Sequence, residues 1–438
     1  MVLPIILLSY FMILLDNSII FTSTVKIAQD LNLNSQTLAW VSSAYTLTFG
    51  GFQLFGGRVG DVFGRKRVFL IGLILFSFGS LMVGLSTNAA MIISMRAFQG
   101  IGSAILAPTT LALLMDNYHG FMRNRAIAAY GATAGVGASF GLVIGGVITS
   151  EFSWRYGFFL NVPVGILMFI LTIFFIHGNK SEKPGKLDFI GTFLSVIGLS
   201  ALVYSINGTT HQLVALVVAI VALILFIYAE HLVSDPIMPL RLFADKQRSS
   251  AYIARFFFIG AAFAYFFVTP QALQNVYGFT PLLAGLAFLP ATLPQFVGAM
   301  QVSRLSAKMG NARLIILSIV LVIVSVLITA VLGLDRGYWL AIAIPMILFG
   351  VGQGFGLSPL TVEGVANTDA NIAGAASGVV NTVHQFGQSV GMSVVVSLTS
   401  SIKTPASSYH YQLLIITVIA FLSLIASIWL KLSTKNSN

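Results

Sequence analysis

Asp16 is the acidic residue of this sequence best placed to do chemistry. It falls in the middle of a long apolar run, whereas the other twelve Asp and Glu residues fall in loops or near the ends of such runs. A charged group at the centre of a bilayer costs about 2.5–3.5 kcal/mol even on the lenient insertion scale, so it is rarely retained without a function. A buried carboxyl group can hold a proton or a cation but not both, which is the chemistry of exchange. The alternative is that Asp16 makes only a packing hydrogen bond to Asn17 or Ser18.

Three basic residues within apolar runs are the natural companions of such an acid. Arg96 and Arg255 keep their charge at any physiological pH, so each needs a partner, a set of carbonyl oxygens or water. Arg96 is expected to be either functional or a structural polar tie. Arg255 is expected to extend along its helix to the cytoplasmic face, with a functional role as the alternative. His384 is of the type that titrates near neutral pH, which suits a second proton site, although a neutral imidazole bound to a backbone carbonyl is an equal alternative.

The composition requires that these residues be positioned inside a membrane. The 438 residues are 57% hydrophobic and 8% charged, whereas a soluble domain carries about 25% charged residues. So few charges could not cover the surface of a water-soluble globule. The absence of cysteine excludes disulfides and thiolate metal sites, and no metal-ligand cluster, catalytic triad or nucleotide-binding loop stands out. We therefore expect an all-α integral membrane protein without a cofactor.

The apolar runs predict fourteen transmembrane helices, since a spanning helix needs about 20 apolar residues. The expected ranges are 4–25, 37–56, 68–87, 90–114, 126–149, 156–177, 188–206, 212–233, 250–272, 280–302, 314–333, 338–361, 373–399 and 411–431. The loops between them are too short to hold a soluble domain, so the function is expected to lie within the membrane.

The basic residues predict the orientation of these helices. Lys and Arg gather in alternate loops, so that one side of the membrane carries most of them. Because cytoplasmic loops carry the excess of Lys and Arg, both termini are expected in the cytoplasm of a multi-pass protein of the cytoplasmic membrane. The net charge of +10 is then a signal of topology, and no nucleic-acid partner is expected.

A weak internal repeat predicts how the helices are grouped. The segment 57–67 recurs at 303–313, with two arginines and a glycine at matching positions. The simplest account is two six-helix bundles, 1–186 and 235–438, with an inserted two-helix hairpin at 187–234. Parallel repeats of this kind are typical of transporters that rock around a central site.

Several segments resemble one known family over essentially the whole chain. The matching segments are Leu15–Ile20, Gly57–Arg67, Arg96–Gly102 and Trp154–Gly165, with further similarity at Gly285–Pro290 and Gly374–Gly391. Together they resemble the fourteen-helix drug:proton antiporter branch of the major facilitator superfamily. The resemblance implies the major facilitator fold and the export of drugs in exchange for protons, driven by the proton gradient. It also implies that Arg96 belongs to the proton path and acts on Asp16.

The resemblance assigns roles to two further groups of residues. The cytoplasmic gate loop would comprise Gly57, Asp61, Gly64, Arg65 and Arg67. The antiporter motif of the fifth helix would comprise Gly137, Gly141, Gly145 and Gly146, whose spacing allows close helix packing. Here the chain departs from the family pattern, because Leu142 stands where the motif normally has a proline. The proline kink is therefore lost, which weakens the case for export over uptake.

One acid surrounded by apolar and aromatic residues suits a lipophilic cation or zwitterion. Cation–π contact could come from Tyr45, Phe49, Tyr130, Tyr265 and Phe267, although lipid contact or packing is the favoured role for each. The expected partners are small lipophilic drugs or cations, protons and membrane lipid, and the protein is expected to be a monomer.

Other functions on the same sequence are less well supported. The nearest alternatives are an exporter of a natural metabolite and an uptake symporter on the same fold. A sensor would need a soluble output domain, and a channel would show a higher flux than a transporter. An enzyme is not expected, because one buried acid provides no general acid–base pair.

Overall fold

The computed structural model describes residues 2–176, 188–233, 236–368 and 373–435. These residues form helices joined by short connections, and no strand occurs among them. They divide into two compact units, one of Met1–Ser205 with Thr210–Ile237 and the other of Ile206–Thr209 with Met238–Asn438. We call these unit 1 and unit 2, and the three-part division at 186 and 234 stays a prediction.

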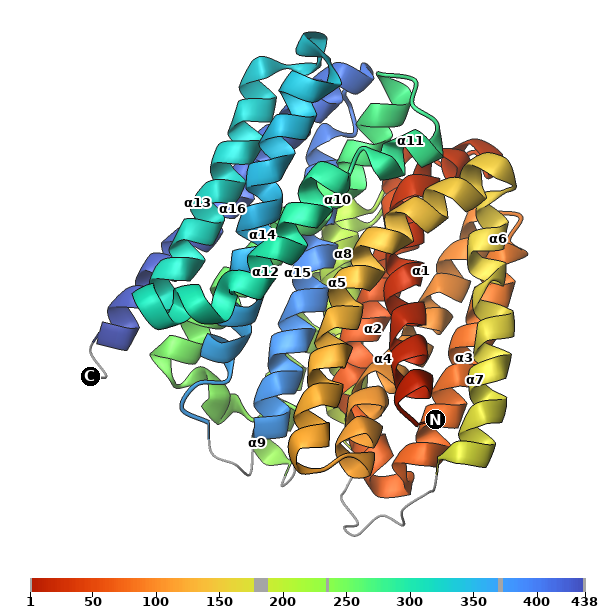
Figure 1. The fold of residues 1–438 in the computed structure, drawn as a ribbon, viewed down its shortest axis with the longest axis vertical. Coiled ribbons are helices and arrows are strands. Elements are labelled where there is room, and N and C mark those ends of the chain that lie inside the picture. The colour runs from red at the N-terminus through yellow and green to blue at the C-terminus, as the bar shows by residue number, and fades with distance from the viewer. Residues whose placement is uncertain (1, 177–187, 234–235, 369–372, 436–438) are drawn as a thin grey trace. The chain divides into compact units, whose positions relative to one another are not determined.

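Unit 1 contains the helices coloured red to yellow-green in Figure 1. They are α1 (Val2–Asp30), α2 (Ser35–Phe63), α3 (Arg65–Gly84), α4 (Ala89–Asn117), α5 (Gly120–Glu151), α6 (Trp154–Phe159), α7 (Asn161–Phe175), α8 (Phe189–Asn207) and α9 (Gln212–Leu232). Asparagine side chains begin two of them, since Asn34 Oδ1 accepts a hydrogen bond from Thr37 N at 2.8 Å and Asn88 Oδ1 from Met91 N at 2.9 Å. Such caps satisfy backbone donors that have no partner within the helix.

Unit 2 contains the helices coloured green to blue in Figure 1. They are the short η1 (Leu240–Phe243), α10 (Lys246–Asn275), α11 (Pro281–Leu286), α12 (Leu289–Met309), α13 (Asn311–Leu332), the short η2 (Leu334–Arg336) and η3 (Trp339–Ala343), α14 (Ile344–Gly364), α15 (Ala373–Thr399) and α16 (Pro405–Lys435). Within this unit α10 packs against α14, α15 and α16, and α12 and α13 both pack against α14.

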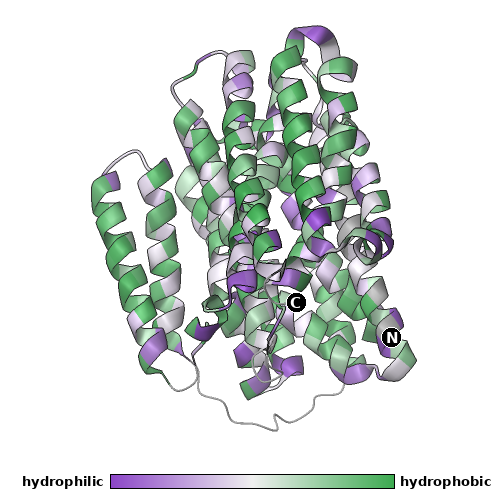
Figure 2. Cartoon of the chain, turned by 90° about the vertical axis from the view of Figure 1, so that its left-hand side faces the viewer, coloured by the Kyte–Doolittle hydropathy of each residue, from purple (hydrophilic) through white to green (hydrophobic). Residues whose placement is uncertain are grey.

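Eleven helical segments of the described residues are long and apolar enough to cross a membrane. The predicted ranges 37–56, 126–149 and 373–399 coincide with α2, α5 and α15, which are helices but do not belong to this set. Figure 2 shows hydrophobic residues along the helices and hydrophilic ones gathered near their ends. The prediction of a multi-span membrane protein is therefore confirmed. The predicted count of fourteen spans is not confirmed, because eleven of the described segments meet the criteria for a span.

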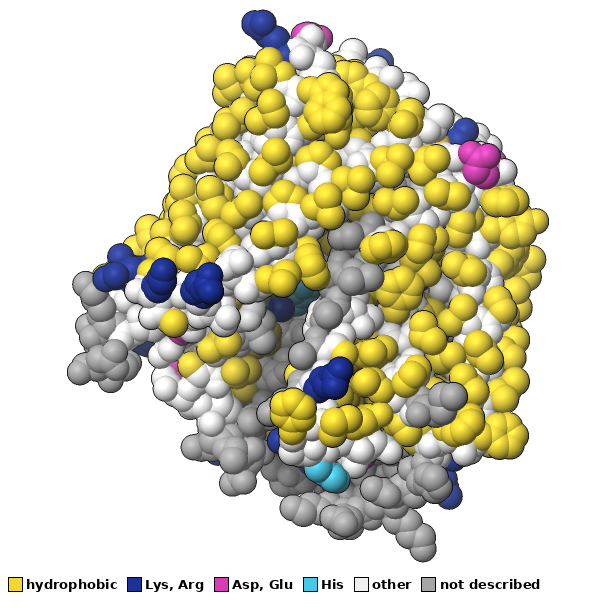
Figure 3. Space-filling model, in the orientation of Figure 1, with side chains coloured by type: hydrophobic (Ala, Val, Ile, Leu, Met, Phe, Trp, Pro, Cys, Tyr) yellow, Lys and Arg dark blue, Asp and Glu magenta, His cyan; other side chains and the backbone are white. Residues whose placement is uncertain are grey.

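The outer surface of the helices is apolar, as lipid contact requires. Figure 3 shows one face of the molecule largely covered by hydrophobic side chains. On α9, for example, Leu213, Val214 and Ile224 are each at least 60% exposed. Water would make such a surface unfavourable, but lipid tails solvate it without cost.

Glycine allows the helices around the candidate site to approach closely. A Cβ atom at Gly79 on α3 would lie 2.8 Å from Gln99 Cα on α4, and one at Gly100 would collide with the carbonyl oxygen of Tyr45 on α2. Close backbone approach through small residues is the usual way in which membrane helices pack. These two glycines hold α2 and α3 against the segment of α4 that carries Arg96 and Gln99.

Candidate functional site

Asp16 lies at the centre of a polar cluster inside unit 1. Its side chain is fully buried on α1, and three N–H groups from other helices converge on its two oxygen atoms. Arg96 Nη1 lies 2.6 Å from Oδ2, while Gln99 Nε2 and Asn161 Nδ2 lie 2.8 and 3.0 Å from Oδ1. We call Asp16, Arg96, Gln99 and Asn161 the acid cluster.

The packing hydrogen bond from Asp16 to Asn17 or Ser18 is not formed. Asn17 Nδ2 donates to the carbonyl of Ile13, and Ser18 Oγ donates to the carbonyl of Leu14. Asp16 instead forms its hydrogen bonds with α4 and with the first residue of α7.

Arg96 is held on every side by groups that suit a cation. Besides Asp16, it donates from Nη1 to Gln99 Oε1 at 2.8 Å and from Nε to the carbonyl of Val41 at 3.3 Å. Its guanidinium carbon lies 4.1 Å from the centre of the Tyr45 ring, which is within the range of a cation–π contact. Tyr45 thus stacks on a cation of the protein itself and is fixed by a 2.7 Å hydrogen bond to Ser103 Oγ.

The sequence reasoning assigned no role to two members of the acid cluster. Gln99 and Asn161 both lie in segments that carry the family resemblance, but nothing in their types indicated that they would meet Asp16. Asn161 also donates to Ser80 Oγ on α3 at 2.9 Å, and Ser80 Oγ donates to the carbonyl of Phe158 at 2.8 Å. The cluster therefore ties together α1, α2, α3, α4 and the junction of α6 and α7.

This arrangement can respond to a single proton. All three neighbours donate to Asp16, so the geometry fits an ionised carboxylate paired with Arg96. Adding a proton removes the negative charge and occupies one acceptor position, which leaves a buried arginine without its counter-ion. Because an unpaired buried charge is strongly unfavourable, protonation would change how α1 is held to α4.

The glycines of α5 pack directly on the segment of α1 that carries Asp16. A Cβ atom at Gly137 would lie 2.8 Å from Leu14 Cβ, and one at Gly145 would lie 2.8 Å from Ile19 Cα. A Cβ atom at Gly141 would collide with Ser18 Cβ. Gly146 is buried in the same helix, and α5 runs without interruption through the buried Leu142.

The predicted gate loop forms a tight turn between α2 and α3. Gly64 has φ 94°, a conformation that favours glycine, and its N–H closes α2 on the carbonyl of Gly60 at 3.1 Å. Arg65 donates to Asp61 Oδ1 at 3.0 Å and also pairs with Asp116 at the end of α4. The sequence reasoning missed Asp116, because an acid near a helix end looks like an ordinary surface residue.

The two remaining residues of the predicted gate loop take no part in these ion pairs. Gly57 is close to Pro108 on α4, at a distance where a Cβ atom would make ordinary contact. Arg67 is exposed and forms no ion pair with the described residues.

The equivalent turn of unit 2 is held by neutral amides instead of an arginine. Gly310 has φ 81° between α12 and α13, and the next residue is Asn311 where unit 1 has Arg65. Asn311 Nδ2 donates to Glu363 Oε1 at 2.9 Å, and Gln247 Nε2 donates to Glu363 Oε2 at 2.6 Å. The carboxylate near the end of α14 thus takes the place that Asp116 has in unit 1.

His384 and Arg255 lie together in unit 2. Arg255 is only 6% exposed, and its Nη2 lies 3.2 Å from His384 Nδ1. Its Nη1 donates to Thr361 Oγ1 at 2.7 Å and to the carbonyl of Leu357 at 3.2 Å. The expectation that Arg255 extends to the cytoplasmic face is therefore wrong. His384 Nε2 lies 3.0 Å from Gln388 Nε2. Both ring nitrogens therefore face side chains, and the alternative bond from His384 to a backbone carbonyl is not formed with the described residues.

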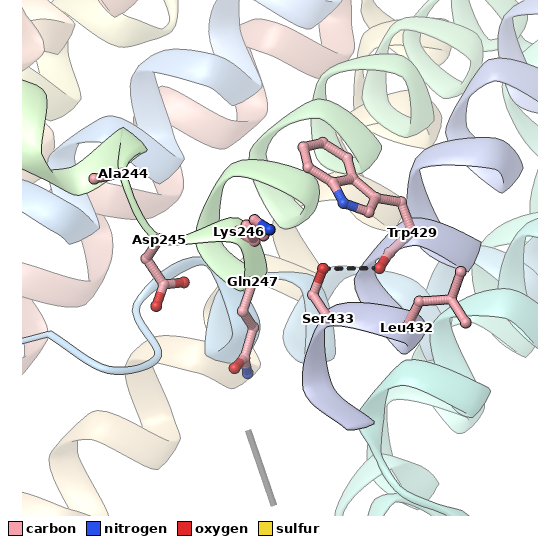
Figure 4. Close-up of a pocket in the computed structure, with 7 residues that line it drawn as sticks. All are labelled: Ala244, Asp245, Lys246, Gln247, Trp429, Leu432 and Ser433. Atoms are coloured by element: carbon pink, nitrogen blue, oxygen red, sulfur yellow. Dashed lines mark hydrogen bonds between the residues drawn. The ribbon is translucent and has the colours of Figure 1, made fainter. Parts of the chain in front are cut away.

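A surface pocket in unit 2 is separate from these clusters. It lies between the start of α10 and the end of α16 and is lined by Ala244, Asp245, Lys246, Gln247, Trp429, Leu432 and Ser433 (Figure 4). None of the predicted site residues lines it. Across the ranges that the structure describes, no group of three or more metal-ligating side chains occurs either.

The fold and the acid cluster define a helical membrane protein with a buried ionisable site. The chain matches the sequence model of the Major Facilitator Superfamily over residues 6–392, and it belongs to that superfamily. It is therefore a membrane transporter and not an enzyme, and the predicted family is confirmed.

Curated relatives extend over most of the chain. It is 31% identical over 418 residues to the puromycin resistance protein pur8 of Streptomyces alboniger, covering 93% of this chain and 82% of that one. It is 32% identical over 405 residues to the cephamycin export protein CmcT of Amycolatopsis lactamdurans, covering 90% and 83%. It is 27% identical over 407 residues to multidrug resistance protein 3 of Bacillus subtilis, covering 91% and 78%. At the level of the family, these names support drug export.

Solved structures share the fold at lower identity. The nucleoside transporter NupG superimposes with a TM-score of 0.73 at 13% identity, covering 98% of this chain and 99% of that one. A bacterial homologue of the lysosomal transporter Spinster, in an inward-facing conformation, superimposes with a TM-score of 0.70 at 15% identity, covering 99% and 96%. At such identities the likeness establishes the architecture alone.

Proposed function

We propose that this protein exports lipophilic drugs across the cytoplasmic membrane in exchange for protons, by alternating access. The names of its relatives support export of antibiotics and other drugs. The cargo class that the sequence favours is a lipophilic cation or zwitterion, and the protein acts as a monomer without a cofactor.

The acid cluster is the observation that carries this proposal. Asp16 is the proton-binding group, and Arg96 is its counter-ion when the carboxylate is ionised. Proton uptake from the outside releases Arg96 from Asp16, and the cation is then held by the Tyr45 ring, Gln99 and the carbonyl of Val41. Proton release to the cytoplasm restores the pair. The position of α1 relative to α4 within unit 1 thereby depends on one proton.

Exchange of one proton for one monovalent cation moves no net charge. Such a cycle runs on the pH gradient alone, at about 1.4 kcal/mol for each pH unit. A second proton would add a contribution of about 2.3 kcal/mol per 100 mV of membrane potential. We assign the proton to Asp16 and place His384 in cargo binding, because its Nδ1 faces the guanidinium of Arg255.

The proposed topology has fourteen spans with both termini in the cytoplasm. The eleven apolar segments together with α2, α5 and α15 make up this number. The excess of Lys and Arg on one side supports the orientation. In this orientation the turn at Gly64, with the Arg65 ion pairs, lies on the cytoplasmic side.

The direct test is ethidium efflux from cells that express the wild type or Asp16→Asn, each with and without a protonophore. Glu151→Gln is the matched control, since Glu151 is an exposed acid in the same unit. We expect efflux by the wild type and by Glu151→Gln, abolished by protonophore, and at least a tenfold slower rate for Asp16→Asn. Wild-type efflux that survives the protonophore would remove proton coupling from the proposal.

Uptake on the same fold is the second candidate, and Leu142 is the observation that favours it. The antiporter motif normally has a proline there, and α5 instead continues unbroken from Gly120 to Glu151. Inverted vesicles distinguish the two directions: acidifying the lumen should drive ethidium inward if the protein is an exporter. Ethidium accumulation that instead requires an acidic medium would identify a symporter.

A further inference from the structure

Arg255 is a buried charge in unit 2 that the proposed proton cycle does not use. It has three hydrogen bonds to described residues, to Leu357 O, Thr361 Oγ1 and His384 Nδ1. A guanidinium carries five N–H groups, so two remain. One of these is on Nε, which is buried and donates to no described group.

No described carboxylate compensates the charge of Arg255. In unit 1, Arg96 is paired with Asp16, so the two charges cancel. In unit 2, Glu363 is occupied by Gln247 and Asn311, and no described acid lies within ion-pair distance of Arg255. A buried cation without a counter-ion is costly and marks a functional site inside a membrane protein.

A second buried arginine of unit 2 shows what a purely structural role looks like. Arg248 is 6% exposed and donates from Nε to the carbonyl of Leu242 at 3.0 Å. Its Nη1 donates to the carbonyls of Ala366 and Asn367, which follow the end of α14. Carbonyl groups at a helix C-terminus carry partial negative charge and stabilise a cation. Arg255 has one carbonyl where Arg248 has several.

His384 does not neutralise the charge of Arg255. An arginine only donates, so His384 Nδ1 must accept, and the ring proton is then on Nε2. That N–H faces Gln388 Nε2 at 3.0 Å, and it forms a hydrogen bond when the Gln388 amide is turned so that its oxygen takes the place of Nε2. A protonated ring would place two cations in contact. His384, Thr361 and Gln388 are each partly exposed, so a ligand can reach this edge of the cluster.

We infer that Arg255, with His384, Thr361 and Gln388, binds a carboxylate group of the cargo. A carboxylate can take the N–H groups of Nε and Nη2 in two parallel bonds, the geometry in which arginine binds carboxylates most strongly. This inference rests on the proposed function and narrows its cargo. The preferred cargo is a lipophilic zwitterion, and a purely cationic drug uses the transporter without this contact.

The matched probes for this site are two fluorescent dyes that differ by one methyl group. Rhodamine 110 is a zwitterion with a free carboxylate, and rhodamine 123 is its methyl ester, which is a cation. Binding of each dye to the purified full chain in a neutral detergent is measured by fluorescence anisotropy, for the wild type and for Arg255→Gln. Arg304→Gln is the control, because Arg304 is an exposed arginine of the same unit.

Loss of a charge-assisted contact should weaken the binding of rhodamine 110 to Arg255→Gln by about tenfold or more. The binding of rhodamine 123 to Arg255→Gln should change less than about twofold, and this retained binding also shows that the variant is folded. The control Arg304→Gln should bind both dyes as the wild type does. Arg255→Lys retains the positive charge but lacks the paired N–H groups of the guanidinium, so its loss of affinity for rhodamine 110 should be intermediate.

Several results would overturn the inference. These are an equal loss of both dyes, no loss of rhodamine 110, or no binding of rhodamine 110 by the wild type. Displacement of rhodamine 110 by phosphatidylglycerol but not by an unlabelled aromatic carboxylate would assign the site to a lipid headgroup instead. The binding measurement uses no proton gradient. It therefore tests the carboxylate site even if proton-coupled efflux is not observed.

Discussion

Asp16 and Arg96 form a buried ion pair in which Arg96 Nη1 lies 2.6 Å from Asp16 Oδ2. The two residues are 80 positions apart in the sequence and lie on α1 and α4. The two charges cancel, and the groups around the pair are neutral donors and an aromatic ring. A proton is the smallest change that can unbalance it. This makes the pair both a structural tie and the place where a proton can act.

The stability of single and double variants tests whether the two charges act as one unit. Removing one partner of a buried ion pair typically costs about 3–5 kcal/mol, because the other charge is left alone. We expect Asp16→Asn and Arg96→Gln each to lower the unfolding temperature of the purified protein strongly. The double variant should be less destabilised than the sum of the two. Additive losses would mean that the residues contribute independently.

Gln99 and Asn161 are expected to support the carboxylate rather than the fold alone. Each donates one hydrogen bond to Asp16, and a hydrogen bond to a charged group contributes about 1.5–3 kcal/mol. Gln99→Leu and Asn161→Leu should therefore slow proton-driven ethidium efflux by about tenfold or more. Asn117→Leu is the control, since Asn117 bonds the carbonyl of Leu113 in its own helix. Efflux by Asn161→Leu at the rate of Asn117→Leu would exclude this role.

The positions of the helices and the two residues of the ion pair could be predicted from the sequence. Long apolar runs are visible without a structure, and a charge inside such a run is rare enough to single out Asp16 and Arg96. Gln99 and Asn161 gave no such signal, because a neutral amide is tolerated in many environments. Their role depends on which helices are neighbours, and that is decided by tertiary packing.

Arg255 shows a different limit of sequence reasoning. It lies near the start of an apolar run, where a long side chain can equally turn outward to water or inward to the bundle. The choice was decided by partners more than 100 residues away, Thr361 on α14 and His384 on α15. The surrounding residues of α10 are apolar on several faces, so no pattern indicated which face was internal.

The Arg65 ion pairs are expected to control transport more than stability. Asp61 and Arg65 are partly exposed, and exposed ion pairs contribute about 0–1 kcal/mol each. Arg65→Asn copies the residue that unit 2 has at Asn311 and removes the charge from this position. We expect a small change in unfolding temperature and a several-fold slower efflux. Arg67→Asn serves as the control, and equal efflux by the two variants would show that the ion pairs of Arg65 have no role in transport.

Gly141 offers the sharpest test of the contact between α5 and α1. A methyl group there would collide with Ser18 Cβ, two residues from Asp16, whereas a methyl group at Gly131 on the same helix meets nothing within 4 Å. Overpacking of this kind costs about 1–3 kcal/mol, while alanine in a helix is otherwise favoured over glycine by about 1 kcal/mol. Gly141→Ala should therefore lower the unfolding temperature and slow efflux, and Gly131→Ala should do neither.

The collision at Gly141 can also be relieved from the other side. Ser18→Gly removes the colliding Cβ atom. Leu15 Cα then lies 3.5 Å from the new methyl group, which is an ordinary contact distance. The double variant Ser18→Gly with Gly141→Ala should then recover most of the efflux lost by Gly141→Ala alone. Efflux of Gly141→Ala equal to that of Gly131→Ala would show that close approach of α5 to α1 is not needed. Failure of the double variant to recover would place the effect of Gly141 somewhere other than Ser18, because the steric cause would have been removed.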